Sequence, residues 1–521
     1  METIVPNNAH FPPLLIALCN PAIYPHPVDT VRIIETHISW VLLAGEFAYK
    51  IKKPVNFGFL DFSSLAKRQF YCAEELRLNR RLSTDLYLEI LPITGTLVQP
   101  VLAGTGQVLE YAIKMSQFPS ERLLADMAAR RLLDVDCCDQ IAERIAAFHD
   151  NISVAGDDFP YGDADTVRHW FDENFMQIYP LLTQQPAIAQ MQSLQAWGDG
   201  EWQAKVMVMQ ERKQQGFVRE CHGDLHLGNM TMIDGKVVLF DCIEFNPELR
   251  WIDIMSDVAF LLIDLLHYAY DRYANRALNR YLQLSGDYGG LALLRYYLVY
   301  RALVRAKLAL LSTNQPCEAP LQEQAWAEYR LFSGLAERFI QAILPTLIIT
   351  HGKSGSGKST WAAQMAEHIG AIQLRSDVER KRLFGYRPEQ HSAGEIYSPT
   401  ASEQTYCRLE QLACQVIKAG FSVIVDATFL KKAQRWSFQQ LAQECGVPFL
   451  IVDFDITEAA LLARIERRQT FQKDASEADA SVLQQQIQAA EPLTAEENAW
   501  VMNADRSMDD MLVMLEKQHR T

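Results

Sequence analysis

The sequence predicts two different folds in series, an α+β fold over residues 30–335 and an α/β fold with a doubly wound parallel sheet over residues 345–521. Strand-like runs dominate the region before Pro119, whereas the segments from Pro119 to Pro345 are mostly helical. After Pro345, short apolar strands alternate with amphipathic helices, the pattern of repeated strand–helix–strand units in a parallel sheet. We therefore expect two domains of different class.

Length, composition and charge support this division. The chain has 521 residues, whereas single hydrophobic cores stop growing at about 250–300 residues. Its apolar (49%) and charged (22%) fractions are close to globular averages, so most of the chain can bury a core. The net charge of −15 opposes non-specific binding to nucleic acid or to an anionic membrane surface. We expect small-molecule partners rather than a nucleic acid.

The lack of a recognisable secretory signal and the pattern of the cysteines lead us to expect a cytoplasmic protein. The first residues, M-E-T-I-V-P-N-N, lack the basic segment and long apolar core of a secretory signal. The most apolar stretch, Val258 to Leu266, contains Asp264 and is shorter than the roughly 20 residues of a membrane span. We expect a buried helix there and no membrane span. The ten cysteines form no C-x-x-C pair and are expected to be reduced thiols.

The first domain is expected to begin with a small α/β lobe. A Pro-rich leader, residues 1–29, precedes a segment, Val31 to Lys53, predicted to form two strands that turn at Ala44-Gly45-Glu46. Helical spacing from Ser64 to Leu82 and strand-like runs at 86–102 and 108–115 complete this lobe.

The remaining segments complete the two folds. The helical region is interrupted near 222–245, where V-V-L-F-D is typical of a strand. The strands expected in the second domain are T-L-I-I-T, A-I-Q-L, S-V-I-V-D and P-F-L-I-V-D-F-D. The boundary is placed near Leu344-Pro345, because proline ends the preceding helix, and we expect each part to fold on its own.

A glycine-rich loop opens the second domain. The segment G-K-S-G-S-G-K-S fits the pattern G-x-x-x-x-G-K-[ST] and lies between a predicted strand, Leu347 to Thr350, and a predicted helix from Thr360. Its glycines let backbone N–H groups turn toward phosphate oxygens, while Lys358 reaches the β- and γ-phosphates and Ser359 offers a hydroxyl to Mg²⁺. The loop therefore predicts ATP and Mg²⁺ as cofactors. The residues expected to bind the nucleotide are Gly352, Lys353, Ser354, Gly355, Ser356, Gly357, Lys358, Ser359 and Thr360.

Two acidic residues follow the next strands. Asp377 in L-R-S-D-V-E-R is our candidate general base for an acceptor hydroxyl, although Ser376-Asp377 also suits the N-cap of the following helix. Asp426 ends the apolar run V-I-V-D, which is the pattern of a carboxylate that organises Mg²⁺.

A charged helix is a candidate lid. The segment Thr457 to Gln469 carries Arg464, Arg467 and Arg468 and leads into a polar stretch. Arginines of a closing lid would compensate the charge of a transferring phosphoryl group, and we assign this role to Arg464 and Arg468. A solvated charged face fits the same spacing.

Residues 346–521 resemble the P-loop kinases of the zeta-toxin, polynucleotide-kinase and gluconate-kinase type. The resemblance implies a P-loop NTPase fold and phosphoryl transfer to a hydroxyl. It leaves the acceptor open.

A second constellation lies in the first domain. The segment H-G-D-L-H-L-G-N has the H-x-D-x-x-x-x-N spacing of a kinase catalytic loop, and Asp241 follows at the end of V-V-L-F-D. Asp224 would orient or deprotonate the acceptor hydroxyl, while Asn229 and Asp241 would hold Mg²⁺. With a β-rich lobe before a helical lobe, these residues predict a bilobal protein-kinase-like fold.

Residues 30–335 resemble the aminoglycoside phosphotransferase and choline kinase group, whose catalytic loop commonly reads H-G-D-x-H-x-x-N. The whole chain looks like a bacterial fusion of this module to a P-loop kinase. The resemblance also implies that Asp253 and Asp257, in W-I-D-I-M-S-D, support the catalytic loop.

The phosphate-binding lysine of the first domain has two candidates. Lys50 and Lys52 in F-A-Y-K-I-K-K lie on the same strand face, and we favour Lys50 by its likeness to the V-A-I-K pattern. Its ion-pair partner is expected on the helix that follows, with Glu75 favoured over Glu74. The Gly-rich loop of protein kinases is missing, and T-H-I-S-W occupies its place.

The sequence thus predicts a Mg²⁺-dependent bifunctional kinase that transfers the γ-phosphoryl group of ATP to hydroxyls of small polar molecules. A nucleotide-gated regulator with one degenerate module is the first alternative, because the Gly-rich loop is absent. A polynucleotide 5′-hydroxyl kinase is the second, and it would require a basic channel.

Overall fold

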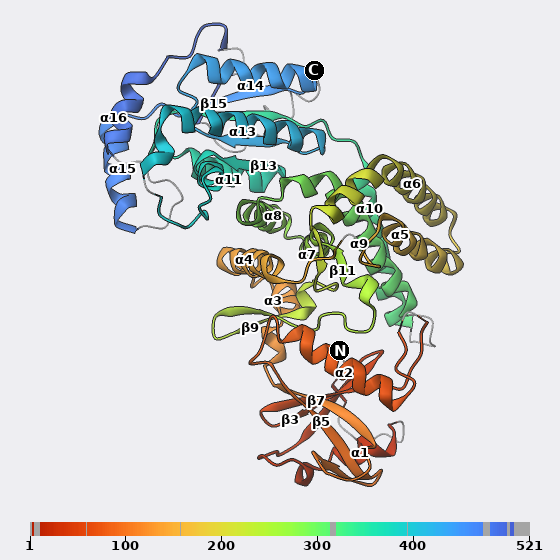
Figure 1. Ribbon diagram of the computed structural model, residues 1–521. Coiled ribbons are helices and arrows are strands. Elements are labelled where there is room, and N and C mark those ends of the chain that lie inside the picture. The colour runs from red at the N-terminus through yellow and green to blue at the C-terminus, as the bar shows by residue number, and fades with distance from the viewer. Residues whose placement is uncertain are drawn as a thin grey trace. The chain divides into compact units, whose positions relative to one another are not determined.

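The computed structural model describes residues 3–4, 11–58, 60–156, 158–312, 319–392, 394–471, 480–497 and 501–504 (Figure 1). Within helix α15, the side chains from residue 467 onward lie outside this description. The predicted order, a β-rich lobe, then helices, then a parallel α/β sheet, is confirmed.

An antiparallel sheet forms the N-terminal lobe. Its strand order is β1-β2-β3-β4-β7-β5-β6. The strands are β1 (Thr3–Ile4), β2 (Val31–Glu35), β3 (Ser39–Ala44), β4 (Phe47–Lys52), β5 (Tyr87–Thr96), β6 (Gln99–Leu102) and β7 (Glu110–Ser116). Helix α2 (Leu65–Asn79) contacts β5 and β7.

The N-terminal segment is part of this lobe rather than a separate leader. Helix α1 (Pro13–Leu18) buries Leu15 and Leu18 in one core cluster with Ile33 and Leu42 of the sheet. Proline at the start of the helix is favourable because the first N–H groups of a helix have no intrahelical partner.

The segment from Val31 to Lys52 forms three strands, so the prediction of two strands was wrong. A second turn at Thr36–Ile38 separates β2 from β3. The Thr36 hydroxyl accepts the Ser39 N–H at 2.9 Å, and the Thr36 N–H donates to the Ser39 carbonyl at 2.9 Å. A side-chain turn of this kind carries no glycine or proline signal.

Helices and two short two-stranded sheets follow the first sheet. Strand β8 (Val218–Glu220) pairs with β11 (Trp251–Asp253), and β9 (Met230–Ile233) pairs with β10 (Lys236–Leu239). The helices are α3 (Leu124–Ala129), α4 (Val135–Asn151), α5 (Ala164–Ile178), α6 (Gln185–Gln214), α7 (Ile254–His267), α8 (Asp271–Ser285), α9 (Leu291–Leu311) and α10 (Ala319–Ile340).

The C-terminal sheet is parallel throughout, with the order β13-β14-β12-β15-β16. Its strands are β12 (Leu347–His351), β13 (Ile372–Arg375), β14 (Val423–Asp426), β15 (Phe449–Asp453) and β16 (Val501–Asn503). Its helices are α11 (Lys358–Ile369), α12 (Ser376–Leu383), α13 (Pro399–Lys418), α14 (Lys432–Cys445), α15 (Glu458–Phe471) and α16 (Ala480–Ala489).

Both faces of this sheet are buried. Ile348 and Ile424 pack in one cluster with Met365 of α11, while their neighbours Ile349 and Val425 are buried on the opposite face. Because the strands are parallel, their carboxyl ends meet at one edge, where ligands of such sheets bind.

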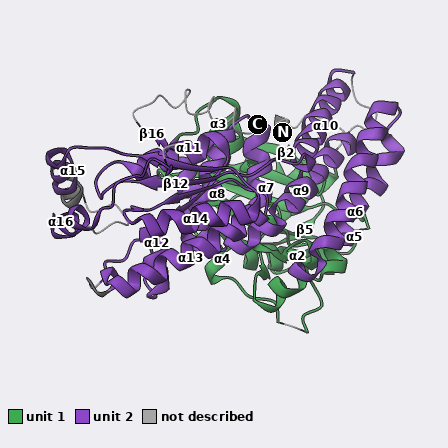
Figure 2. Cartoon of the chain, turned by 90° about the horizontal axis from the view of Figure 1, so that it is seen from above, with its two compact units in different colours: residues 1–134, 147–167, 210–257 green, residues 135–146, 168–209, 258–521 purple. Residues whose placement is uncertain are grey.

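The chain forms two compact units, coloured in Figure 2. Unit 1 comprises residues 1–134, 147–167 and 210–257, and unit 2 comprises residues 135–146, 168–209 and 258–521. Unit 2 therefore joins α8, α9 and α10 to the P-loop sheet across the boundary placed near residue 345, and the domain limits from sequence remain a prediction. None of the helices in the described part of the chain has the length and apolar character to cross a bilayer.

Candidate active sites

The first candidate site, in unit 1, is built around Lys50. Its ammonium nitrogen lies 2.7 Å from Glu75 Oε1 and 2.5 Å from Asp241 Oδ1. Strand β4 supplies the lysine, helix α2 supplies the glutamate, and Asp241 follows strand β10. Lys50 therefore contacts a residue that lies 191 positions further along the chain. Asp241 has a positive φ of 65°, an uncommon conformation for a residue with a side chain.

Lys52 occupies a different place on the same strand face. It is fully buried, donates to Glu75 Oε2 at 2.5 Å and also pairs with Glu244. Glu75 thus serves both lysines, and only Lys50 also contacts Asp241. Glu74, the other candidate on α2, pairs instead with Arg77. The structure brings Lys50 and Glu75 together with Asp241, the arrangement expected for the favoured residues, and their functional roles remain predictions.

Electrostatics keep this cluster charged. Burial opposes ionisation of the Glu75 carboxyl, but Lys50 and Lys52 outweigh it and lower its pKa to about 2. Burial likewise opposes the Lys50 ammonium, yet Asp241 and Glu75 hold its pKa well above the ordinary value. Burial raises the pKa of the Glu244 carboxyl despite its pairing with Lys52. Lys50 is therefore positively charged at this site.

The catalytic-loop residues lie side by side. The Asn229 side-chain amide donates to Asp224 Oδ2 at 3.0 Å and to the Asp224 carbonyl at 3.0 Å. His226 Nε2 lies 3.3 Å from the same carboxylate, which is about one-third exposed. The Asp224 carboxylate is thus oriented from two directions and remains accessible to an acceptor.

Asp257 holds the catalytic loop by its backbone. Its carboxylate accepts the N–H groups of His222 at 3.0 Å and Gly223 at 2.9 Å. His222 is fully buried, and its Nε2–H donates to the Phe240 carbonyl at 2.8 Å. Burial lowers the pKa of His222, which favours the neutral ring. These contacts agree with the supporting role that the family resemblance implies for Asp257.

A buried trio beside the loop has metal-ligand residue types. Ligand atoms of His149, Cys221 and Asp257 lie within 4.8 Å of one another. Both Asp257 oxygens already accept loop N–H groups, and His149 Nε2 lies 3.2 Å from one of them. We therefore assign this trio to loop support. Asp253 is held nearby by Arg212 at 2.7 Å.

The second candidate site, in unit 2, is the loop between β12 and α11. Gly352, Gly355 and Gly357 have φ values of 146°, 84° and 97°, a range that favours glycine. Lys358 is buried, and its ammonium donates to the Lys353 carbonyl at 2.7 Å and to the Ser356 hydroxyl at 3.3 Å. Lys358, Ser359 and Thr360 form the first turn of α11, so the groups predicted to bind phosphate lie at a helix N-terminus.

Asp426 ends strand β14 beside this loop. It is buried, and its Oδ2 accepts a hydrogen bond from Gln373 Nε2 at 3.1 Å. Burial raises the pKa of Asp426, while Arg375 and Lys358 oppose the shift. The same Gln373 nitrogen lies 3.3 Å from the Ser359 backbone carbonyl, so one amide contacts both predicted metal-binding residues of this site.

Asp377 lies inside helix α12, which begins at Ser376 with Arg375 as the cap residue and no side-chain capping bond. The N-cap interpretation of Asp377 is therefore wrong, because the helix starts one residue before it. Asp377 influences the pKa of Asp426, which places its charge near the P-loop site. Its proposed role as base remains a prediction.

Two segments from the C-terminal part contact the P-loop. The Arg464 guanidinium donates to the Ser356 carbonyl at 3.2 Å. Gln486 of α16 accepts the Ser354 N–H at 2.8 Å and donates to the Ser354 hydroxyl at 3.0 Å. The side chain of Arg468 lies outside the described residues.

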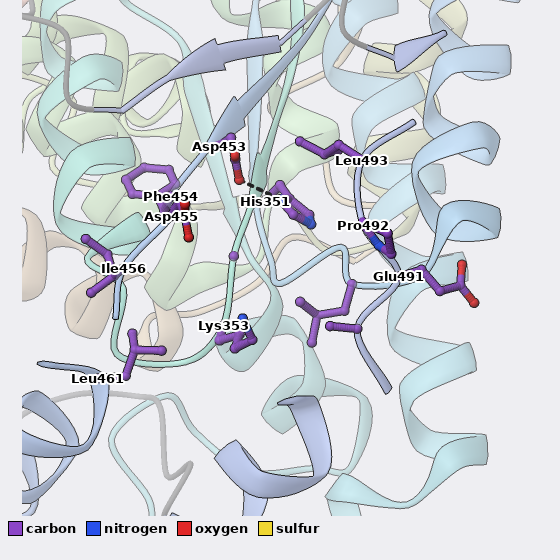
Figure 3. Close-up of a pocket in the computed structure, with 13 residues that line it drawn as sticks. His351, Lys353, Asp453, Phe454, Asp455, Ile456, Leu461, Glu491, Pro492 and Leu493 are labelled. Carbon is purple, nitrogen blue, oxygen red and sulfur yellow. Dashed lines mark hydrogen bonds and ion pairs between the residues drawn. The ribbon is translucent and has the colours of Figure 1, made fainter. Parts of the chain in front are cut away.

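A pocket of about 340 Å³ adjoins the first residues of the P-loop (Figure 3). His351 and Asp453, at the carboxyl ends of neighbouring strands, line it and form an ion pair with Nδ1 and Oδ1 2.6 Å apart. Lys353 is on its floor in this view, and Phe454, Ile456 and Leu493 provide apolar walls. The pocket combines ionisable groups with apolar surface, as small-molecule sites do.

Sequence reasoning missed several of these polar residues. Glu244 follows Asp241 by three positions and is the polar residue that completes the Lys52 pair. Gln373 is the polar residue in the otherwise apolar run A-I-Q-L, a position that signals a buried hydrogen bond. The pairing of His351 with Asp453 could not be foreseen, because it depends on which strands are neighbours.

Comparisons with known proteins bear on both parts of the chain. A family model described as an AAA domain matches residues 347–493. Uncharacterized proteins of Mycobacterium tuberculosis (strain ATCC 25618 / H37Rv) and Mycobacterium bovis are each 28% identical over 466 residues, which is 88% of this chain and 91% of the relative. That length exceeds either part of the chain alone, so the similarity extends over both.

Solved structures also match parts of the chain. The Mycobacterium tuberculosis APS kinase in complex with AMPPNP and APS is 18% identical with a TM-score of 0.26, covering 34% of this chain and 98% of that one. A gluconokinase from Sinorhizobium meliloti 1021 is 19% identical with a TM-score of 0.23, covering 32% and 88%. The GDP complex of aminoglycoside 2′-phosphotransferase-IIIa is 13% identical with a TM-score of 0.38, covering 60% and 94%.

Proposed function

We propose that the chain is a bifunctional phosphotransferase that moves the γ-phosphoryl group of ATP to hydroxyl groups of small polar molecules, once in each site. The observation that supports the proposal is a buried lysine in each unit, together with side chains that carry oxygen ligands suited to Mg²⁺. Asp224 in the first site and Asp377 in the second are the carboxylates that we propose as bases. The AAA-domain match over residues 347–493 supports nucleotide binding in the second site.

The residues of the first site fit Mg²⁺. The amide nitrogen of Asn229 faces Asp224, so its amide oxygen is left for a cation. Lys50 contacts Asp241 through Oδ1, and the Asp241 side chain is 38% exposed. Carboxylate and amide oxygens are the ligands that Mg²⁺ prefers. Asn229 and Asp241 would therefore hold the metal in the first site.

The residues of the second site fit the same cation. Gln373 Nε2 contacts both the Asp426 carboxylate and the backbone carbonyl of Ser359, and Ser359 follows Lys358 in the first turn of α11, so two residues with oxygen donors lie together at this site. Mg²⁺ bound in either site would neutralise charge on the phosphate oxygens.

The chain's own residues would then orient the reactants. Lys50 and Lys358 bind phosphate oxygens, and each stands close to the proposed metal ligands of its site. Asp224 would accept the proton of the acceptor hydroxyl in the first site, and Asp377 would do so in the second. Arg464, which already contacts the P-loop, would stabilise the charge on the transferring group.

Acceptor-dependent ATP turnover tests the proposal. The purified full chain is screened with Mg²⁺-ATP against sugars, nucleosides, aminoglycosides and oligonucleotides. We expect turnover stimulated by at least one small hydroxyl compound, lost in Asp224→Asn for one acceptor class and in Lys358→Ala for another. ATP binding without stimulation by any acceptor would contradict a phosphotransferase.

A nucleotide-gated regulator is the second candidate, and one observation favours it. In place of a Gly-rich loop, β2 and β3 are joined by the tight turn at Thr36–Ile38. Lys50 is also occupied by both of its carboxylate partners. Nucleotide binding that changes protection from hydrogen exchange, with no transfer to any acceptor, would support this alternative.

A further inference from the structure

A chain of buried side-chain amides links helix α8 to the P-loop site within unit 2. Gln283 Nε2 donates to Gln373 Oε1 at 3.3 Å, and Gln373 Nε2 donates to Asp426 Oδ2 at 3.1 Å. The same Gln373 nitrogen lies 3.3 Å from the Ser359 carbonyl. Gln283, Gln373 and Asp426 are all less than 10% exposed. The amides therefore run from α8 to the Asp426 carboxylate and to the backbone carbonyl of Ser359, the two residues proposed to hold the metal.

Asn279, one turn before Gln283 on α8, fixes the strand that carries Gln373. Its Oδ1 accepts the Gln373 N–H at 2.7 Å, and its Nδ2 donates to the Ala371 carbonyl at 2.9 Å. Strand β13 is at the end of the sheet order, so among the described residues no strand pairs with it on that side. Asn279 thus fixes the position of β13, while Gln283 fixes the orientation of the Gln373 side-chain amide.

The direction of these hydrogen bonds determines which atom of Gln373 faces Asp426. A glutamine amide has a donor end and an acceptor end, and the Gln283 donor leaves the Gln373 nitrogen to face Asp426. A donor at this position stabilises the ionised carboxylate and fixes its rotamer. A reversed amide would place an oxygen against the carboxylate.

We propose that Gln373 is a positioning residue for Asp426, and that Gln283 and Asn279 of α8 hold Gln373 in that role. The inference rests on the proposed function of the P-loop site. It makes α8, which precedes the P-loop by more than 65 residues, part of the apparatus that prepares the second site for Mg²⁺. Partners that orient metal ligands typically change metal affinity by about 10–100-fold when removed.

The test measures the Mg²⁺ requirement of ATP binding in the full chain. An Asp241→Ala parent weakens Mg²⁺-ATP binding at the first site, so that the P-loop site dominates, and fluorescent ATP is titrated with Mg²⁺ and, separately, in EDTA. We expect Gln373→Met to raise the half-saturating Mg²⁺ concentration by about 10–100-fold. We expect Gln283→Leu to raise it by about two- to tenfold, as for one lost hydrogen bond. ATP affinity in EDTA should stay unchanged in both variants.

Gln283→Glu separates positioning from general stability. A carboxylate at position 283 accepts the Gln373 nitrogen and turns the amide oxygen toward Asp426, so this variant should require more Mg²⁺ than Gln283→Leu. Asn275→Ala is the matched control, because Asn275 also lies on α8 but donates to the Glu367 carbonyl of α11, away from the amide chain. It should retain the parent's Mg²⁺ requirement.

Each outcome is decisive. If the parent binds Mg²⁺-ATP and the variants need no more Mg²⁺ than the parent does, the positioning role is wrong, while the proposed function still stands. Equal losses with Mg²⁺ and in EDTA would also overturn it, because they indicate a damaged fold. A parent without Mg²⁺-dependent ATP binding at the P-loop would instead overturn the proposed function on which the inference rests. If Gln373→Met does not fold, the comparison of Gln283→Leu with Gln283→Glu still tests the positioning role.

Discussion

The two candidate sites hold their phosphate-binding lysines in opposite ways. Lys50 lies between the carboxylates of Glu75 and Asp241, whereas Lys358 donates to a loop carbonyl and a hydroxyl. Under the proposed function, phosphate oxygens would compete with two carboxylates in the first site, and in the second they would compete with a backbone carbonyl and a hydroxyl. A local strand–loop–helix segment forms the second site, and long-range contacts form the first.

The largest expected effect is the complete loss of one binding site. Calorimetry of the wild-type chain with Mg²⁺-ATP should show two sites, with the P-loop site the tighter one because Lys358 donates to a carbonyl and a hydroxyl, whereas Lys50 lies between two carboxylates. Lys358→Ala should remove only the tighter site, and Asp241→Ala should weaken only the other. A single site in the wild type would contradict the comparison.

Asp377→Asn tests the acceptor side of the second site. Removing a proton acceptor from a reacting hydroxyl costs about 10²–10⁴-fold in rate. Since Asp377 is not the cap residue of α12, its amide analogue should melt within a degree or two of the wild type and bind ATP normally. Acceptor-dependent turnover near the wild-type value would remove Asp377 from the mechanism and leave Asp426 as the carboxylate of interest.

Glu75→Gln tests the first site through stability. It leaves Lys50 and Lys52 without their shared counter-charge, and breaking a buried ion pair costs about 3–5 kcal/mol. Glu74→Gln is the control, because its partner Arg77 is about half exposed and such pairs contribute about 0–1 kcal/mol. Urea unfolding of the two variants measures the difference. Equal losses would mean that the charge cluster does not stabilise the lobe.

The smallest expected effect is a change in pH dependence. The pKa of Glu75 falls from its ordinary 4.5 to about 2 in the folded chain, so its ionised form stabilises the fold above pH 4.5. This stabilisation is lost as the pH falls from 4.5 toward 2. The difference in unfolding free energy between wild type and Glu75→Gln should therefore shrink over that range. A difference independent of pH would contradict this.

The sequence allowed the P-loop site to be predicted more completely than the kinase-like one. The fixed spacing of glycines, Lys358 and Ser359 places them on one continuous turn, so local geometry suffices. On β4, by contrast, alternation puts Lys50 and Lys52 on one face, and the choice between them depends on where Asp241 arrives from 191 residues away. That contact follows from tertiary packing, which periodicity does not encode.

Other differences have equally specific causes. The turn at Thr36 was missed because it depends on a threonine hydroxyl rather than on glycine or proline. The N-terminal helix α1 was read as leader because its few residues are too short for a periodic signal. The contact of Gln283 with Gln373 joins segments that sequence patterns assign to different domains.

Asn279 has a consequence for how the chain avoids self-association. An edge strand offers unpaired N–H and C=O groups to any other strand, and proteins commonly cover such edges. Here one asparagine amide satisfies two backbone groups on this side, the carbonyl of Ala371 just before β13 and the N–H of Gln373 within it, as a neighbouring strand would. A fragment beginning at residue 345 lacks this cover. Its β13 edge would be open to pairing with a second copy, so such fragments should aggregate with increasing concentration while the full chain stays in solution.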